Sequence, residues 1–275
     1  GKATNVAGVV DRLLGPGDTV EVELVVFRPD SAEGRYIAEL QSKELTHVKV
    51  RSVIVESTAR FCINLSDPAS PASARVEFNL SPRVIWQPSA VQTAVAFAAG
   101  AGTDLLLLAG NPPVIAPDNK LAADLPASIL KTANGAAAVS IDIEKGLAQC
   151  LEGSRQLDVV KINRDEFLSV DQRHWARYKG ILVVTDDDGC TAWEHGPSGE
   201  SVRIDRPTGH PVFSTVGAGD AAHAGFTVAH WIRGLDTVHA AQYAMATSAA
   251  SVSSPEGTRG VQREVVDAFF HSTYR

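Results

Sequence analysis

The sequence is poor in sulfur-containing residues, which limits the chemistry it can support. It has 275 residues, of which 3 are cysteine and 1 is methionine. Cys62, Cys150 and Cys190 are far apart and form no CxxC pair, so we expect no zinc or redox site. We expect instead reduced, mostly buried thiols in a cytosolic protein. The only methionine is Met245, so the sequence does not open on a translation start and we expect a segment to precede it.

Long apolar runs and blocks of basic residues are also missing. The chain has 25 Lys and Arg against 32 Asp and Glu, a formal net charge of −7, and no basic cluster that would bind a phosphate backbone. The most apolar window, residues 90–110, is interrupted by polar residues and glycines and does not predict a membrane span. The sequence has no basic segment followed by an apolar core, so it does not predict a secretory signal. The composition therefore indicates a cytoplasmic globular protein with no nucleic-acid or membrane partner.

The pattern of apolar residues indicates an α/β fold. Continuous apolar runs predict buried strands, and stretches with helical spacing separate them. We expect strands near 19–27, 103–110, 137–143, 157–163 and 180–185, and helices near 4–14, 31–43, 89–100 and 117–133 and from 218 onward. This alternation predicts a mostly parallel sheet with helices on both faces and ligands at the carboxyl ends of the strands. Residues 47–80 differ, because three β-like runs without a helix between them predict an antiparallel patch.

A glycine-rich segment near the C-terminus is the sharpest local feature. Gly217 and Gly219 precede a helix of small residues, so backbone N–H groups at the helix start can bind an anion such as phosphate. Asp220 would lie in that cradle, where a carboxylate can accept a proton from a hydroxyl that attacks a phosphate.

Two other interpretations of this segment remain open. Gly217, Gly219 and Ala222, with Asp236 further on, match a dinucleotide-binding fingerprint, although the segment lies late in the chain and no second strand is expected at Asp236. The segment could also be an ordinary glycine-rich turn leading into a tightly packed helix.

Other candidate residues lie at expected strand and helix ends. Asn163 and Glu166 are three residues apart after a buried strand and could share a hydrated Mg²⁺, or they could simply begin a capped helix. Lys2 and Asn5 lie at the start of the first expected helix, without the spacing of a Walker A loop.

Further titratable residues are weaker candidates. Asp118 and Asp142 lie near strand ends, but nothing in the sequence selects them. His223 and His230 share a helix face without a third ligand, so packing is the favoured interpretation over a metal site.

Several segments, taken together, resemble the ribokinase/PfkB-type sugar kinases. They are G-K-A-T-N-V-A at 1–7, S-T-A-R at 57–60, A-G-N-P-P at 109–113, K-I-N-R-D-E at 161–166 and S-T-V-G-A-G-D at 214–220. Their order and spacing along the whole chain are most similar to the branch of 1-phosphofructokinase and tagatose-6-phosphate kinase. The resemblance implies one ribokinase-like domain over 1–275, with a small β-sheet lid within about 47–80. It also implies that the first strand of the family fold lies before residue 1.

The resemblance also implies roles for individual residues. Asp220 would be the catalytic base, and the amides of Gly217, Ala218 and Gly219 would form the anion hole. Mg²⁺ would be held through water by Asn163 and Glu166, and the nucleotide would be contacted by Lys161, Asn163 and Thr185. The sugar phosphate would be contacted by Lys2, Asn5 and Arg60.

The implied reaction is transfer of the ATP γ-phosphate to a sugar phosphate, with ATP and Mg²⁺ required. Fructose 1-phosphate is the expected acceptor, and tagatose 6-phosphate or another sugar is the alternative. Loops 109–113 and 186–188 depart from the family pattern, so a homologue that binds nucleotide or sugar phosphate without turnover is a second hypothesis. Free edges on the lid strands further suggest a homodimer through the lid.

Overall fold

The computed structural model describes residues 2–57, 61–66, 75–80, 84–85, 87–98, 103–111, 120–132, 135–153 and 156–275. The helices are α1 (Lys2–Leu13), α2 (Ala32–Glu44), α3 (Pro88–Ala98), α4 (Lys120–Thr132), α5 (Leu147–Glu152), α6 (Arg164–Ser169), α7 (Gln172–Trp175), α8 (Ala218–Thr227), α9 (Thr237–Val252) and α10 (Arg263–Tyr274). A π-helical segment, η1 (Val228–Ile232), extends α8, and a 3₁₀ turn, η2 (Gly257–Gly260), precedes α10. The strands are β1 (Val22–Pro29), β2 (Val48–Ser57), β3 (Phe61–Ser66), β4 (Arg75–Leu80), β5 (Val84–Ile85), β6 (Leu105–Ala109), β7 (Ala138–Asp142), β8 (Val159–Asn163), β9 (Ile181–Asp186), β10 (Gly189–Trp193) and β11 (Ser201–Asp205).

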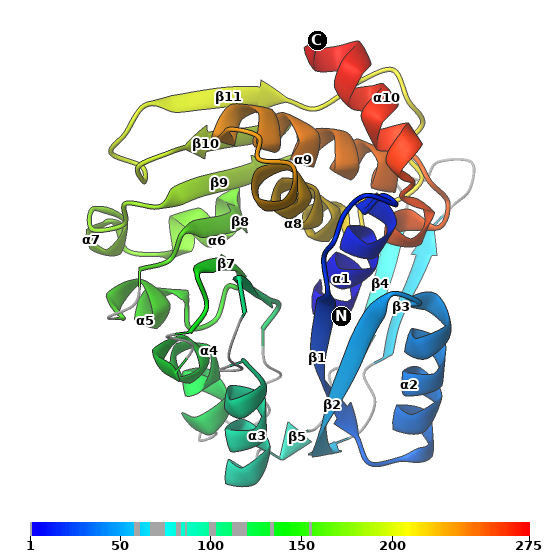
Figure 1. The fold of residues 1–275 in the computed structure, drawn as a ribbon, viewed down its shortest axis with the longest axis vertical. Coiled ribbons are helices and arrows are strands. Elements are labelled where there is room, and N and C mark those ends of the chain that lie inside the picture. The colour runs from blue at the N-terminus through cyan, green and yellow to red at the C-terminus, as the bar shows by residue number, and fades with distance from the viewer. Residues whose placement is uncertain are drawn as a thin grey trace.

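The largest sheet has six strands in the order β11-β10-β9-β8-β7-β6. Strands β6 to β9 run parallel, so their carboxyl ends meet at one edge, whereas β10 and β11 are antiparallel additions. Figure 1 shows α8, α9 and α10 on one side of this sheet and α4 and α5 on the other. The prediction of a mostly parallel sheet with helices on both faces is therefore confirmed.

Successive side chains of the central strands point to opposite faces of the sheet, and the two faces pack against different helices. On β8, Val160 and Ile162 join the apolar cluster with α4, α5 and α7, while Val159 joins the cluster with α1, α8, α9 and α10. Because side chains alternate between faces, Lys161 lies on the same face as Val159, the face covered by α1 and α8. The same alternation puts polar residues of β7 on that face, so this layer carries both core packing and polar side chains.

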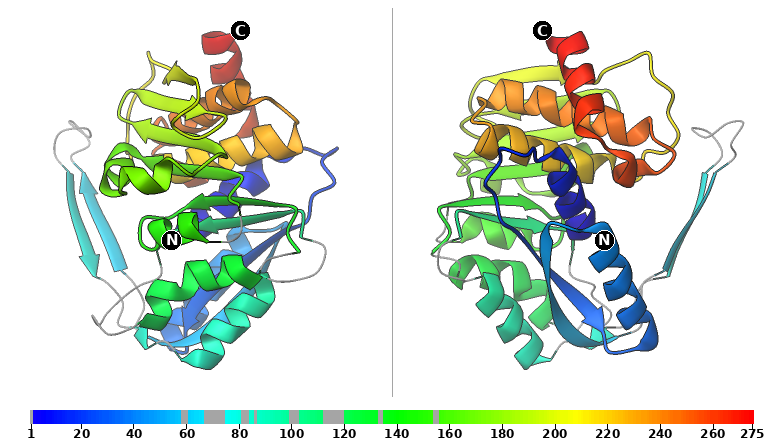
Figure 2. Two further views of the ribbon diagram at one scale, coloured as in Figure 1. Left: turned by 90° about the vertical axis from the view of Figure 1, so that its left-hand side faces the viewer. Right: turned by 45° about the vertical axis from the view of Figure 1, so that its right-hand side comes forward.

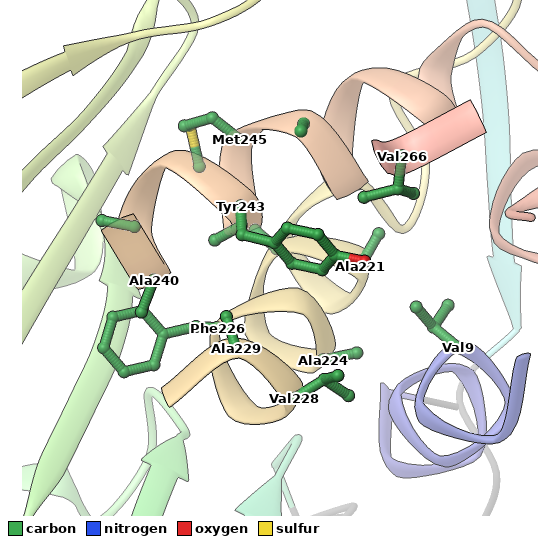
Figure 3. Packing of buried hydrophobic residues seen from close by; sticks show 14 of the residues in the cluster. Val9, Ala221, Ala224, Phe226, Val228, Ala229, Ala240, Tyr243, Met245 and Val266 are labelled. Carbon is green, nitrogen blue, oxygen red and sulfur yellow. The ribbon is translucent and has the colours of Figure 1, made fainter. Parts of the chain in front are cut away.

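Packing between α8 and α9 forms the centre of the larger core. Figure 3 shows small and aromatic side chains interlocking there, with Phe226 and Tyr243 fully buried between the two helices and Val9 of α1 beside them. Small residues such as Ala221 and Ala224 have no exposed surface, which lets the helix backbones approach closely. This packing fixes α8, and hence the start of α8, against the sheet.

A second sheet has the order β1-β2-β5 and corrects one prediction. We expected residues 47–80 to form a single antiparallel patch, but β2 pairs in parallel with β1, from Val22 opposite Val48 to Pro29 opposite Val55. The crossover helix α2, capped by Ser31, makes the parallel pairing possible. Helix α1 packs against both sheets, on β1 and β6.

The antiparallel prediction holds for the later part of the 47–80 segment. Strands β3 and β4 pair antiparallel, with Phe61 opposite Leu80, and β2 meets β5 antiparallel. Figure 2 shows β3 and β4 as a two-stranded ribbon that stands out from the body of the molecule. The segment in which a lid is expected contains this ribbon and part of β2, and its role as a lid stays a prediction.

Two sequence-based expectations about the interior can be compared with the structure. Cys150 and Cys190 are free and buried, as expected, and burial raises the pKa of each thiol to about 12, which makes both unreactive. Cys62 lies on β3, where side chains fall outside the description. In the described part of the chain, no helix has the length and apolar character needed to cross a bilayer.

Candidate active site

The start of α8 has the geometry of an anion site. Its cap residue, Gly217, has a left-handed backbone with φ of 79° and no side chain with which to bond the first amides of the helix. These amides have no acceptor inside the helix, and they lie at the positive end of its dipole. Of the three amides expected to form the anion hole, that of Ala218 already donates to the carbonyl oxygen of Thr215 at 3.2 Å. The segment is therefore suited to a phosphate mainly through its remaining first-turn amides.

Asp220 lies in the first turn of α8 and is only 6% exposed. Its Oδ2 accepts a hydrogen bond from Nδ2 of Asn5 on α1 at 2.7 Å, which fixes the orientation of the carboxylate. Burial raises the pKa of Asp220, although the Asn5 hydrogen bond and the positive charge of Lys161 partly oppose this effect. A carboxylate that holds a proton more readily than usual is suited to accept one from a hydroxyl.

Asp142, at the end of β7, joins two lysines. Its Oδ1 lies 2.8 Å from Nζ of Lys2, and its Oδ2 lies 3.0 Å from Nζ of Lys161. Asp142 has no exposed surface and Lys161 is 3% exposed, so the Asp142–Lys161 ion pair is shielded from water. The structure thus brings together α1, β7 and β8 through a single carboxylate.

The ammonium of Lys161 points toward the start of α8. A methyl group added at Gly219 would lie 2.9 Å from Nζ of Lys161, so the absence of a side chain there makes room for the lysine. A cation beside the positive end of a helix favours the binding of an anion between them. This arrangement supports the assignment of Lys161 and the α8 amides to one phosphate-binding region.

The charges in this cluster determine its protonation states. Burial disfavours the ionised form of Asp142, but the positive charges of Lys161 and Lys2 outweigh it and lower the pKa of Asp142 to about 2. Burial similarly disfavours charged Lys2, but the charge and hydrogen bond of Asp142 together with the charges of Glu166 and Asp220 outweigh it and raise the pKa of Lys2. Asp142 and Lys2 are therefore both charged near neutral pH.

Asn163 and Glu166 form a capping box at the start of α6. Oδ1 of Asn163 accepts from the Glu166 amide at 2.8 Å, and Oε2 of Glu166 accepts from the Asn163 amide at 2.9 Å. The other oxygen of Glu166, Oε1, lies 3.8 Å from Nζ of Lys2. The capped helix considered in the sequence analysis is present, and it leaves one carboxylate oxygen facing the cluster.

This donor set fits a hydrated Mg²⁺ better than a protein-only metal cage. Among the described residues, no three His, Cys, Asp or Glu side chains are arranged to hold a metal ion. Mg²⁺ usually keeps several waters and binds one or two carboxylates together with substrate phosphates. Glu166 and Asn163, next to the phosphate-binding region, supply that kind of partial coordination.

Strand β9 brings Thr185 next to Asn163, because the two residues are direct partners in the β8–β9 register. Beyond Thr185, the acidic run 186–188 forms the exposed turn between β9 and β10. Oδ2 and Oδ1 of Asp186 accept hydrogen bonds from Arg203 at 2.5 and 2.8 Å. The acidic run is therefore a surface turn, and an arginine balances one of its charges.

The loop after β6 departs from the family pattern in a way that the structure explains. Oδ1 of Asn111 accepts from the amides of Glu144 and Lys145, each at 2.9 Å, and its Nδ2 donates to Glu144 at 3.1 Å. Gly110, with φ of 87°, lies against Lys2, since a side chain there would meet Cβ of Lys2 at 3.1 Å. Asn111 thus fastens the loop after β6 to the loop after β7.

Several sequence-based candidates lie away from this site. Asp236 caps α9 by accepting from the His239 amide at 2.9 Å, so it is not the acidic residue of a dinucleotide fold. Nδ1 of His230 lies 2.9 Å from the carbonyl oxygen of Leu235, in agreement with a packing role. Arg60 and Asp118 lie outside the described residues.

Sequence reasoning did not select Asp142, Ser140 or His223. Ser140 and His223 are fully buried, and Oγ of Ser140 lies 2.7 Å from Nε2 of His223. A usable signal was present, because polar residues at alternate positions of an otherwise apolar strand indicate a polar patch on one face. The partners of these residues are far away in the sequence, so that pattern alone does not identify them.

Comparison with known proteins identifies the family and the fold of this chain. The profile of the pfkB family carbohydrate kinases matches residues 1–263. Phosphofructokinase-2 from Escherichia coli, solved in complex with potassium, is 16% identical, with 98% of this chain and 86% of that chain covered and a TM-score of 0.78. A possible 1-phosphofructokinase from Thermotoga maritima is 17% identical, with 98% and 85% covered and a TM-score of 0.78.

A ribokinase is also similar in structure. Ribokinase from Giardia lamblia is 17% identical, with 99% of this chain and 88% of that chain covered and a TM-score of 0.74. A comparison with curated proteins found no match. The structural likenesses establish the ribokinase-like fold, and the family profile extends over nearly the whole chain. The chain therefore belongs to the pfkB family of carbohydrate kinases and is a sugar kinase.

Proposed function

We propose that this kinase transfers the γ-phosphate of ATP to a hydroxyl of a sugar phosphate, with conversion of fructose 1-phosphate to fructose 1,6-bisphosphate as the type reaction. The observation that carries the proposal is the position of Asp220. Its buried carboxylate lies in the first turn of α8, is oriented by Asn5, and has a raised pKa. A base at a phosphate-binding helix start is suited to phosphoryl transfer, because the attacking hydroxyl and the phosphate must meet there.

In the proposed reaction, Asp220 accepts the proton of the sugar hydroxyl as its oxygen attacks the γ-phosphorus in line. The bond between that phosphorus and the bridging oxygen of ADP breaks at the same time. The amides of Gly217 and Gly219, with the ammonium of Lys161, stabilise the negative charge on the transferred group, and the Ala218 amide joins them when it releases its hydrogen bond to Thr215. Asn5 keeps the carboxylate of Asp220 directed toward the hydroxyl.

The nucleotide side of the site is assigned to Lys161, Asn163 and Thr185. They follow one another across β8 and β9 at the carboxyl edge of the sheet, where ligands of parallel sheets bind. Glu166 and Asn163 would hold Mg²⁺ through water. When bound, this ion supplies charge neutralisation at the β- and γ-phosphates.

The sugar phosphate is assigned to Lys2, Asn5 and Arg60. Asn5 lies next to Asp220, in agreement with this assignment, whereas Lys2 is paired with Asp142 and lies nearer to Glu166. For Lys2 to contact a substrate phosphate, its ammonium must therefore move away from Asp142. Tagatose 6-phosphate and other sugars of this kinase family are the alternative acceptors.

A homologue that binds without turnover is the second candidate. It is favoured by the loop after β6, because the side-chain amide of Asn111 forms hydrogen bonds with Glu144 and Lys145 rather than with a ligand. It is disfavoured by the acidic turn, since Asp186 is paired with Arg203 and exposed.

An ADP-release assay tests these proposals. Purified protein with ATP and Mg²⁺ is incubated with fructose 1-phosphate, tagatose 6-phosphate or unphosphorylated fructose. Turnover highest with fructose 1-phosphate supports the proposal, and turnover highest with another sugar selects one of the alternatives. Calorimetric binding of ATP without turnover on any sugar supports the binding-only candidate.

We also propose that the ribbon of β3 and β4 serves as the lid and as the contact of a homodimer. Among the described strands, β3 and β4 pair only with each other, so an outer edge of this ribbon can pair with a second copy and bury its backbone groups. Gel filtration with light scattering tests this. Removal of residues 61–80 should convert a dimer into a monomer, and a monomeric full-length protein contradicts the dimer.

A further inference from the structure

His223 is a fully buried histidine that the proposed reaction does not use. It lies one helical turn after Asp220 on α8 and has no exposed surface. Its Nε2 lies 2.7 Å from Oγ of Ser140 on β7. Among the described residues, its Nδ1 has no hydrogen-bond partner, and Oδ2 of Asp142 lies 3.9 Å from it. An unpaired buried nitrogen is costly, so its presence calls for a physical reason.

The surroundings determine which nitrogen of His223 carries the proton. Burial lowers the pKa of His223 to about 4, so the ring is neutral near pH 7 and has one N–H. With the proton on Nε2, the lone pair of Nδ1 would face the negative carboxylate of Asp142. With the proton on Nδ1, the N–H points toward that carboxylate, and Nε2 accepts from the Ser140 hydroxyl. Electrostatics therefore favours the Nδ1–H form.

The oxygen that faces His223 is the one already bound by Lys161. Oδ2 of Asp142 accepts from Nζ of Lys161 at 3.0 Å, and that ammonium also lies against Gly219 at the start of α8. If the ammonium turns toward a bound phosphate, Oδ2 loses this hydrogen bond. A buried carboxylate oxygen without a donor is costly, and Nδ1–H of His223, 3.9 Å away, can replace the lost donor.

We propose that His223 is a positioning residue that carries its proton on Nδ1 and donates a hydrogen bond from it to Asp142 when Lys161 turns to the phosphate of a bound nucleotide. The exchange keeps Asp142 hydrogen-bonded in both states, and Asp142 therefore continues to hold Lys2. The part concerning the nucleotide rests on the proposed function, whereas the position of the proton in the free protein does not.

A nucleophilic role for this group is excluded by its burial. Ser140, His223 and Asp142 form the order of a serine hydrolase triad, but each of the three is 0% exposed. A nucleophile must reach its substrate, and the hydroxyl of Ser140 is instead needed as the donor to Nε2. The group therefore acts within the protein.

Nitrogen-15 NMR of protein labelled at the histidine rings tests the proposal. Spectra are recorded for the free protein and for protein saturated with Mg²⁺ and the non-hydrolysable analogue adenylyl imidodiphosphate, and His223→Asn assigns the signals. We expect a protonated Nδ1 and an unprotonated Nε2 in the free protein, and a downfield shift of the Nδ1 proton with nucleotide. A protonated Nε2, or an Nδ1 proton that does not shift at saturation, overturns the proposal. If calorimetry shows no binding of the analogue, both the proposed function and the replacement of Lys161 by His223 as the donor to Asp142 are overturned. The spectrum of the free protein still tests whether the proton is on Nδ1.

A pair of variants provides a kinetic test. His223→Asn retains an amide donor near the position of Nδ1, and His223→Leu has a comparable volume without a donor. We expect His223→Leu to raise the KM for ATP about tenfold, because a hydrogen bond to a charged group is lost. We expect the KM of His223→Asn to stay close to that of the unmodified protein, because the asparagine amide keeps this hydrogen bond. Urea unfolding of both variants reports their stability. Equal KM values for the two folded variants contradict the proposal, and if either fails to fold, the NMR result on the unmodified protein decides.

Discussion

Oδ2 of Asp142 accepts a hydrogen bond of 3.0 Å from the ammonium of Lys161 on the neighbouring parallel strand. Both side chains are buried, so water does not screen the two charges. Buried ion pairs of this kind are costly to form and costlier to break. In this kinase the pair lies between the start of α8 and the start of α1, since Lys161 lies against Gly219 and Asp142 also binds Lys2. It therefore connects the stability of the sheet to the geometry of the proposed active site.

Breaking this pair should destabilise the protein. Asp142→Asn preserves the shape of the side chain but leaves the ammonium of Lys161 buried without a counter-charge. We expect a loss of about 3–5 kcal/mol in the free energy of unfolding, measured with urea. The double variant Asp142→Asn/Lys161→Met removes both charges and should recover part of this loss. Losses that simply add in the double variant would show that the two residues are not coupled.

Replacement of the proposed base should separate activity from stability. Asp220→Asn is expected to lower turnover about 10²–10⁴-fold, the usual contribution of a general base. Because the folded pKa of Asp220 is raised, its ionisation at neutral pH opposes folding, and this cost is absent below the unfolded pKa. The variant should therefore unfold at a higher temperature near pH 7. Asp187→Asn, at an exposed turn, is the matched control, and full activity of Asp220→Asn would contradict the assigned role.

The glycine at the start of α8 can be tested against a glycine with similar backbone geometry. Gly217 has φ of 79° and Gly209 has φ of 82°, so alanine at either position carries the left-handed cost of roughly 1–2 kcal/mol. An added methyl group at Gly209 meets nothing within 4 Å, whereas at Gly217 it would lie 2.6 Å from Cγ2 of Thr258. Gly217→Ala should therefore lose more stability than Gly209→Ala in urea unfolding, and it should also lose activity. Equal losses would remove the steric argument.

Acid should weaken the fold through His223. Its pKa is lowered to about 4 by burial, with the charges of Lys161 and Lys2 adding to the effect and that of Asp142 opposing it. The neutral ring stabilises the folded state above the unfolded pKa of about 6.5, and this contribution is lost as the pH falls toward 4. By linkage the loss amounts to about 3 kcal/mol. Urea unfolding across this range should show a smaller pH dependence for His223→Asn than for the unmodified protein, and identical pH profiles would contradict the assignment.

The charge of Glu166 should determine the Mg²⁺ requirement. Glu166→Gln can retain the capping box, since glutamine serves in this motif as well as glutamate. The loss of negative charge should raise the Mg²⁺ concentration for half-maximal activity about 10–100-fold, as for other groups that support a bound metal. The exposed neighbour Asp165 provides the control variant Asp165→Asn. An unchanged Mg²⁺ dependence of Glu166→Gln would place the ion elsewhere.

The local features of this kinase could be predicted from its sequence. Apolar runs and helical spacing depend on neighbouring residues, so they identified the strands β6 to β9, the helix capped by Ser31 and the helix after Gly217. The order of the motifs identified the family and led to Asp220. Short-range patterns of this kind are visible in the sequence because their periods span only a few residues.

The tertiary structure alone decided which distant residues meet. The parallel pairing of β1 with β2 depends on how α2 crosses over, which periodicity does not encode. Lys2 and Asp142 are 140 positions apart and Ser140 and His223 are 83 apart, yet each pair forms a close contact. Such contacts depend on the strand order and on the packing of α1 and α8 over one face of the sheet. The sequence therefore determined most of the elements and pointed to Asp220 as the proposed base, and the fold determined the buried network around Asp142.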